Sequence, residues 1–290
     1  MPVLSIISCG MFEDELTHVL SEDRELTHLI LVDAAGIQGL ARKLRAQNRP
    51  FLTADLAQIP DLVRKQHNTP PFWRMPAKRA RIADAVRRLP HGRNTSEAVV
   101  ANVLKINLHA DTELLKREVY RNIERMSSFS DGILVLFGVC DSLRDLERDF
   151  AGCQCPLYFV ADEHGTRVED CIALALGGNR FRLQISSVHC DILFFFTPMW
   201  ASNWQNARMN ERNQEIARST EKLLKHARFK KRLKLAKVDT GLLYEPNFDE
   251  NVHEFAQLYK LDVISLRGNT DIVEKCYQKA KSSIRERMST

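Results

Sequence analysis

The stretch ILVLFGVCDSLRDL, Ile133 to Leu146, has the pattern of a buried strand that leads through a cysteine into a helix. Five apolar residues, 133–137, precede Gly138, and Asp141 or Ser142 can cap the helix that follows. An uninterrupted apolar run is typical of a strand covered on both faces, as in parallel sheets. The stretch therefore predicts a strand–loop–helix unit with Cys140 in the loop, where α/β proteins bind their ligands.

The same alternation of strand and helix patterns continues along the chain. Further strands are predicted at Val3–Ser8, His28–Val32, Val103–Leu108, Leu157–Val160, Asp191–Phe196, Leu233–Val238 and Asp262–Leu266. We expect an α/β, Rossmann-like, doubly wound and mainly parallel sheet. Residues 1–290 form one α/β domain in this interpretation, with 1–185 and 186–290 as candidate lobes. The Pro-, Arg- and Asn-rich residues of about 47–100 predict an insertion.

Bulk composition is that of an ordinary globular protein. Of the 290 residues, 44% are hydrophobic and 27% are charged, and the net charge of +5 is too small to indicate a nucleic-acid partner by itself. No apolar run reaches the roughly 18 residues that span a bilayer. The start of the chain lacks the basic segment and cleavage site of a signal peptide. We therefore expect a cytoplasmic protein without a membrane partner, whose seven cysteines stay reduced.

One basic segment, Leu223–Lys237, leaves two interpretations open. It can bind phosphates or a nucleic acid, or it can be the solvated end of a helix, where Lys and Arg are favoured. Apart from Phe229 it has no aromatic residues for base stacking, so we favour the helix end and expect no specific nucleic-acid partner. Neither a G-x-G-x-x-G nor a G-x-x-x-x-G-K-[ST] motif is present, so a standard nucleotide site is not supported.

Four chemically active residues follow predicted strands. They are Cys9, His109, Cys140 and Cys171. Because parallel strands end at one edge of a sheet, their side chains can converge there. Three thiolates and an imidazole suit zinc, and three thiolates also suit an iron–sulfur cluster with one open iron. The alternative is that these cysteines are small buried apolar residues, since no pair has C-x-x-C spacing.

Other cysteines and aromatic residues gave weaker indications. Cys153 and Cys155 precede a strand, on the opposite edge, and are interpreted as structural. Trp200 and Trp204 lie one helical turn apart and either line a ligand pocket or pack against the sheet. In the VDTG segment, Asp239 and Gly241 can present a carboxylate and backbone amides to a ligand, or form a plain left-handed turn.

Four stretches, ISCGMFEDEL, INLHADTELLKREV, LFGVCD and EDCIALALGG, resemble the motifs of domain-of-unknown-function family 1638, a prokaryotic family of soluble α/β proteins. The segments FFFTPMWASNW and AKVDTGL resemble its Leu-Thr-x-x-Trp segment and a late Asp-Thr-Gly turn. The resemblance covers about residues 1–20 and 100–285, whereas Leu26–Val100 does not fit it.

The resemblance places all four candidate ligands on motif positions, which favours one shared site. The family often has Tyr at the position of Phe137, and usually His at that of Glu169, just ahead of the Asp-Cys pair. Any catalytic role of that histidine would pass here to Glu169, Asp170 or His164.

The resemblance implies a function only through the systems in which family members occur. Its members accompany corrinoid-dependent methyl-transfer systems, which implies one-carbon metabolism. We expect a protein that binds zinc or an iron–sulfur cluster and takes part in methyl transfer or thiol activation. Its partners would be a small-molecule ligand and a corrinoid protein. The alternative is a non-catalytic accessory or chaperone protein that binds a cofactor or such a partner.

Overall fold

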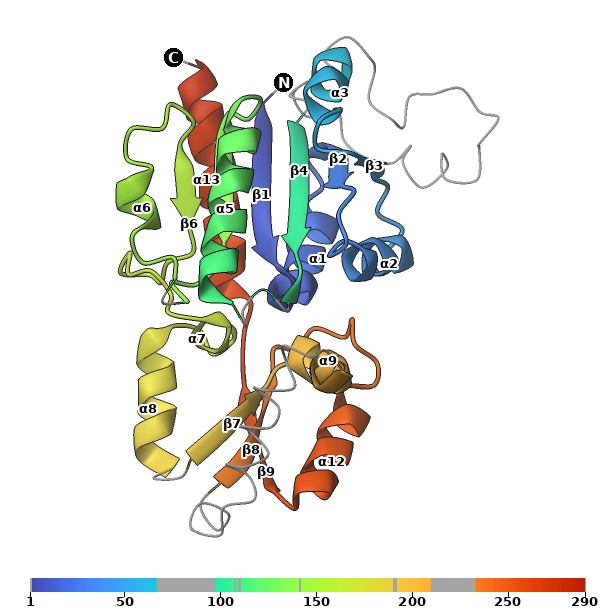
Figure 1. The fold of residues 1–290 in the computed structure, drawn as a ribbon, viewed down its shortest axis with the longest axis vertical. Helices are drawn as coiled ribbons and strands as arrows, with labels where there is room; N and C mark the ends of the chain where they lie inside the picture. Colours follow the sequence, from blue (N-terminus) through green and yellow to red (C-terminus); the bar gives the residue numbers. More distant parts are fainter. Residues whose placement is uncertain are drawn as a thin grey trace.

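The computed structural model describes residues 2–66, 97–106, 108, 111–140, 142–189, 192–209 and 233–289. They form two parallel sheets, one above the other in Figure 1. The larger sheet has the strand order β3-β2-β4-β1-β5-β6, and every neighbouring pair is parallel. Its strands are β1 (Val3–Cys9), β2 (Leu26–Val32), β3 (Leu52–Ala54), β4 (Glu97–Leu104), β5 (Gly132–Leu136) and β6 (Leu157–Phe159). The Rossmann-like fold is thus confirmed.

Helices cover both faces of this sheet. In Figure 1, α5 (Thr112–Ser127) lies in front of the sheet, and α1 (Glu13–Glu22) and α13 (Asp271–Ser289) lie behind it. The helix α2 (Gln38–Ala46) packs against α1. The centre of the sheet is covered on both sides, since every residue of β1 and β4 is buried. This burial explains why these strands lack the alternation of polar and apolar residues.

The smaller sheet has the order β7-β8-β9, with strands Ile192–Phe196, Leu233–Asp239 and Asp262–Arg267. Its helices include α8 (Asn179–His189), α9 (Pro198–Met209) and α12 (Phe248–Tyr259). An aromatic cluster fills its core: Phe194 stacks on Phe255, with ring centroids 5.5 Å apart, and Trp204 meets Phe255 edge to face at 5.3 Å. After β9 the chain returns to the larger sheet through α13.

The carboxyl ends of the two sheets face each other. The amide of Gly268, which follows β9, donates to the carbonyl of Asp239 at the end of β8, and Asn269 donates to Ala175 in α7 (Cys171–Ala175). In addition, η1 (Gly10–Phe12), which follows β1, packs against α9. Both sheets direct their carboxyl edge toward the junction, and this is the edge at which parallel sheets bind their ligands.

Several local predictions need correction. The strand predicted at 103–108 is β4, at 97–104, because residues 98–104 pair with β1 and residues 97–101 pair with β2. The helix predicted after Cys140 is replaced by turns, and α6 (Leu146–Asp149) begins later. The helix α8 was not predicted. The strand β3 and α3 (Ile59–Gln66) fall inside the range 47–100 that predicts an insertion.

No helix in the part of the chain that the structure describes is both long and apolar enough to cross a membrane. Many of the residues in the basic segment Leu223–Lys237 lie outside the described residues, as do His109 and most of the range 47–100.

Candidate thiol site at the junction of the sheets

Three of the predicted ligands are described, and each follows a different strand. Cys9 is the last residue of β1, and its sulfur accepts a hydrogen bond from the amide of Met11 at 3.4 Å. Cys140 lies in a turn after β5, with a positive φ of 44°. Cys171 is the first residue of α7. His109, the fourth predicted ligand, lies outside the described residues.

Backbone contacts fix the Cys140 turn against the segment that leads to Cys171. The amide of Val139 donates to the carbonyl of Val168, and that of Cys140 donates to the carbonyl of Glu169, both at 2.8 Å. The two segments touch at Gly138, where an added Cβ would lie 2.7 Å from the Cα of Asp170. A glycine is therefore required for this close approach.

The three thiols lie close enough to influence one another. Burial raises the pKa of Cys9, and the neighbouring Cys140 adds to the increase. Burial also raises the pKa of Cys171, with further contributions from Cys9, Asp170, Cys140 and Glu15. Cys9, Cys140 and Cys171 thus lie within electrostatic range of one another, and their sharing of one site stays a prediction. In contrast to the expectation for a helix N-terminus, Cys9 and Cys171 favour the protonated form.

Glu15 is a residue near this group that the sequence reasoning missed as a site. Its side chain is buried, and its Oε2 atom has no hydrogen-bond partner among the described residues. Burial, followed by the charge of Asp14, raises the pKa of Glu15 to about 8. The sequence signal is a run of three consecutive acids after Phe12, which in the first turn of a helix is usually explained by the helix dipole.

A buried ion cluster ties α1 and α2 to the smaller sheet. The Nζ atom of Lys43 lies 2.8 Å from Glu13, 2.5 Å from Asp14 and 2.5 Å from Glu245, a residue that follows β8. It also contacts the sulfur of Met199 in α9 at 3.1 Å. Burial lowers the pKa of Lys43, but Asp14 and Glu13 outweigh it and raise the pKa overall, so this lysine stays charged.

The two predicted catalytic acids have structural contacts. The carboxylate of Asp170 accepts from the amide of Ala173 at 2.8 Å and so caps α7. It also forms an ion pair with Arg182, which lies 3.7 Å from Glu169. Glu169 is exposed. These contacts give Asp170 a role in placing Cys171, the residue that follows it.

The four predicted cofactor-binding residues do not gather at one point. Trp200 packs against the apolar clusters of both sheets, including the one that contains Cys9. Trp204 lies in the aromatic core of the smaller sheet. The carboxylate of Asp239 accepts from the amide of Gly241, whose φ is +80°, and this is a local left-handed turn. Of these four residues, Trp200 is the one that packs against the clusters of both sheets.

The types of side chain in this group suit a metal ion, but their arrangement does not. Three thiols and a buried carboxylate are donors that zinc or iron accepts. Among the described residues, however, no three His, Cys, Asp or Glu side chains already stand in an arrangement that could hold a metal ion. Metal binding would therefore require the thiols to lose protons and draw together.

Comparison with known proteins identifies the family but adds no activity. The family model described as protein of unknown function, DUF1638, matches residues 103–277, which include Cys140 and Cys171 but not Cys9. No curated protein and no solved structure matches the chain. The resemblance seen in the sequence motifs is thereby confirmed, and the chain belongs to the DUF1638 family of proteins of unknown function.

Proposed function

We propose that this protein is a cytoplasmic metal-binding protein that takes zinc or an iron–sulfur cluster at Cys9, Cys140 and Cys171, with His109 as a further ligand. The observation that supports the proposal is the position of the three cysteines: Cys9 ends β1, Cys140 lies in the turn after β5, and Cys171 begins α7, whose preceding segment is bonded to the Cys140 turn. Cysteines placed only to fill an apolar core have no reason to gather at the carboxyl edge of a parallel sheet.

The surroundings of the thiols suit thiol chemistry. A bound zinc ion or the open iron of a cluster would supply a Lewis acid that activates a thiol. The protein buries Cys9, partly buries Cys171, and places Trp200 as an apolar wall between the sheets. Methyl transfer within one-carbon metabolism, with a corrinoid protein as partner, is the reaction class that we propose for this site.

Metal analysis after anaerobic purification tests the proposal. We expect stoichiometric zinc, or iron with broad absorption near 400 nm, roughly the charge-transfer region of thiolate-bound iron. Cys140→Gly is the informative variant, because glycine accepts the positive φ at this position and the fold is spared. It should lose the metal while keeping the wild-type melting temperature within a few degrees.

Cys276→Ser is the matched control. The sulfur of Cys276 lies in α13, 3.5 Å from the carbonyl of Ala161, and this variant should keep the metal. A wild-type protein that contains no metal and takes up none from added zinc or iron would overturn the proposal, as would a folded Cys140→Gly variant that retains it. A metal-loaded protein without turnover would favour an accessory role.

A further inference from the structure

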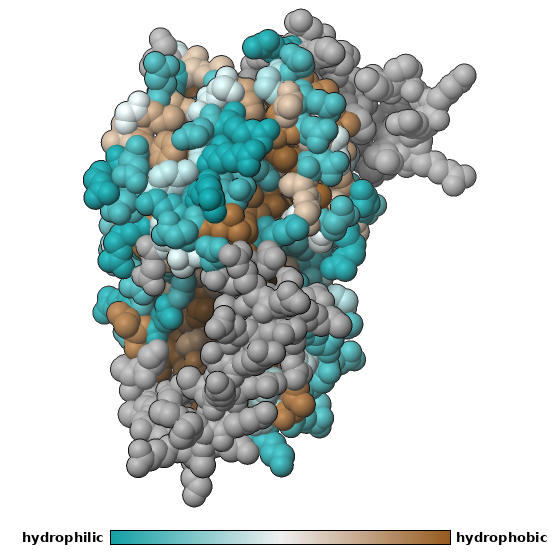
Figure 2. Space-filling view, in the orientation of Figure 1, coloured by the Kyte–Doolittle hydropathy of each residue, from teal (hydrophilic) through white to brown (hydrophobic). Residues whose placement is uncertain are grey.

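A second candidate site lies on the front face of the larger sheet and is lined by none of the three cysteines. It is a cavity of about 510 Å³ between α5, the ends of β2 and β3, and the end of β4. Figure 2 shows a strip of hydrophobic surface on this face, beside the hydrophilic outer surface of α5. The volume is within the range of pockets that bind small molecules, roughly 300–1,000 Å³.

The cavity occupies a place where the sheet topology opens a crevice. The chain leaves β2 toward α2, which packs with α1 behind the sheet, whereas it leaves β4 toward α5 in front. Because β2 and β4 are neighbours and their connections run to opposite faces of the sheet, a crevice opens between the ends of these two strands. Crevices of this kind, at the carboxyl ends of strands, are where open α/β sheets bind ligands.

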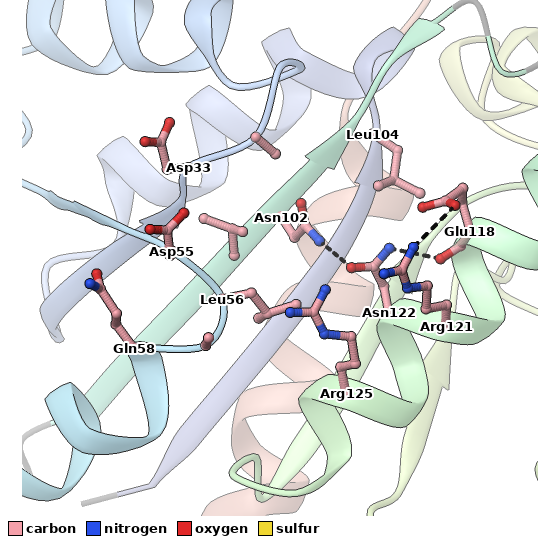
Figure 3. A pocket seen from close by; sticks show the side chains of 13 residues that line it. Asp33, Asp55, Leu56, Gln58, Asn102, Leu104, Glu118, Arg121, Asn122 and Arg125 are labelled. Carbon is pink, nitrogen blue, oxygen red and sulfur yellow. Dashed lines mark hydrogen bonds and ion pairs between the residues drawn. The ribbon is translucent and has the colours of Figure 1, made fainter.

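Asn102 is the residue that points to a ligand. It is only 3% exposed in the middle of the sheet, and its Nδ2 atom donates to the Oδ1 atom of Asn122 at 2.7 Å. Asn122 in turn donates to the carbonyl of Glu118 at 2.7 Å, which fixes both amides (Figure 3). The Oδ1 atom of Asn102 is then left buried without a hydrogen-bond partner among the described residues.

An unsatisfied buried acceptor destabilises the folded state, so its presence in a cavity wall requires an explanation. An apolar residue at this position of β4 would avoid that cost, as in the neighbouring Ala101 and Val103. A ligand that donates a hydrogen bond from a hydroxyl or amino group would satisfy the Asn102 oxygen.

The charged residues divide between two opposite walls. Asp33 follows β2 and Asp55 follows β3, and Figure 3 shows both on the side opposite α5. Arg121 and Arg125 line the other wall from successive turns of α5. Arg121 lies 3.8 Å from Glu118, and Arg125 has no carboxylate within ion-pair distance among the described residues. The apolar residues Val32, Leu56 and Leu104 lie in the same lining.

We propose that this cavity binds a small organic anion that carries hydroxyl or amino groups. Its phosphate or carboxylate pairs with Arg125 and Arg121, and a donor group on the same molecule bonds to the Oδ1 atom of Asn102. Asp33 and Asp55 accept from further hydroxyl or ammonium groups, while the apolar residues contact the carbon skeleton. This site shares no residue with the thiol site and stands independently of it.

Calorimetric titration of the full chain tests the assignment, with ribose 5-phosphate and glycerate as the probes. Ribose and inorganic phosphate are the controls, since each lacks one of the two required groups. We expect the phosphate or the carboxylate probe to bind at least tenfold more tightly than either control, and the better one identifies the anion. If both probes bind no better than the controls, the proposal is wrong.

Arg125→Ala separates the site from general surface charge. This exposed residue can be removed without disturbing the fold, and the variant should bind the better probe at least tenfold more weakly. Arg117→Ala, an exposed arginine on the same helix that does not line the cavity, should bind like the wild type. Equal losses in the two variants, or none in Arg125→Ala, would overturn the proposal.

Asn102→Leu tests the donor group. It should weaken binding of the hydroxylated probe at least tenfold while inorganic phosphate binds unchanged. Retained binding of the probe by folded Asn102→Leu protein would contradict the role of this amide. If that variant does not fold, the comparison of Arg125→Ala with Arg117→Ala still tests the proposal.

Discussion

Cys140 combines a reactive side chain with a backbone conformation that L-residues rarely adopt. Its φ of 44° is held by the hydrogen bond from its amide to Glu169. A residue with a Cβ in this region costs about 1–2 kcal/mol, and glycine avoids most of that cost. Cysteine at this position therefore destabilises the turn relative to glycine. Such backbone strain occurs often at functional sites, which agrees with the role proposed for the Cys140 thiol.

This strain predicts the order of stability among variants at Cys140. Cys140→Gly should be more stable than Cys140→Ala by about 1 kcal/mol, because only the alanine retains the unfavourable conformation. Urea unfolding of both metal-free variants measures the difference. An alanine variant as stable as the glycine variant would show that the turn relaxes.

Asp23 provides a prediction about pH. Burial alone would raise its pKa, but hydrogen bonds from Lys281 and Tyr277 outweigh burial and lower the pKa below its ordinary value. The stability that this carboxylate contributes is therefore fully present above about pH 4 and is lost as the pH falls through the folded-state pKa.

Asp23→Asn should therefore unfold more readily than the wild type at pH 7, because asparagine has no negative charge to offset the burial of the Lys281 ammonium group. The gap in unfolding free energy should narrow between pH 4 and pH 2, and urea titrations at both ends measure it. Glu25→Gln, which changes an exposed acid of the same cluster, should show a smaller gap. A gap that does not change with pH would contradict the assignment.

At the level of elements, α1 and α2 meet so closely that one position admits no side chain. An added Cβ on Gly39 would lie 2.2 Å from a carboxylate oxygen of Glu13, which Lys43 holds in place. Gly39→Ala should therefore destabilise the protein by about 1–3 kcal/mol, although alanine favours helices. Thermal unfolding measures the loss. Gly152→Ala, where a Cβ has open space, is the control and should change little.

Elements with a strong apolar pattern could be predicted from the sequence, and those that depend on distant partners could not. The strand β5 lies within one residue of the apolar run 133–137 that predicts it, because continuous burial marks it locally. The strand β4 was placed too late along the chain, since its pairing with β1 and β2 is a long-range property. The helix α8 is predominantly polar and has a weak pattern.

The candidate sites divide in the same way. Strand ends in a parallel sheet predicted that the cysteines would converge, and Cys9, Cys140 and Cys171 lie within electrostatic range of one another. Asn102 could not be singled out, because one asparagine in an apolar strand carries no signal until its orphaned oxygen and the cavity are seen. Asp33 and Asp55 had a usable signal, an acid directly after an apolar strand, that we did not interpret.

At the level of the whole molecule, Lys43 joins the two sheets. Removing one partner from a buried ion cluster leaves uncompensated charge, which typically costs about 3–5 kcal/mol. Lys43→Met should lose stability in that range, because the buried carboxylates of Glu13 and Asp14 would lose the ammonium group that contacts them. Differential scanning calorimetry should show either a lower single transition or a separate early transition of the smaller sheet.

The matched control is Arg42→Ala. Arg42 also lies near Glu245, at 3.6 Å, but its side chain is 70% exposed. The change should cost less than about 1 kcal/mol, as for other surface ion pairs. Equal losses in Arg42→Ala and Lys43→Met would mean that burial of the cluster does not matter for the contact between the sheets.

Because α13 returns to the larger sheet, the described chain starts and finishes at the same pole of the molecule. The amide of Ala98 donates a hydrogen bond to the carbonyl of Pro2, and Arg285 near the end of α13 forms an ion pair with Glu97. Both contacts lie at the amino edge of that sheet. Figure 1 shows the two ends together, on the far side from the junction. An affinity tag, dye or surface tether attached at either end would therefore lie away from the junction of the two sheets.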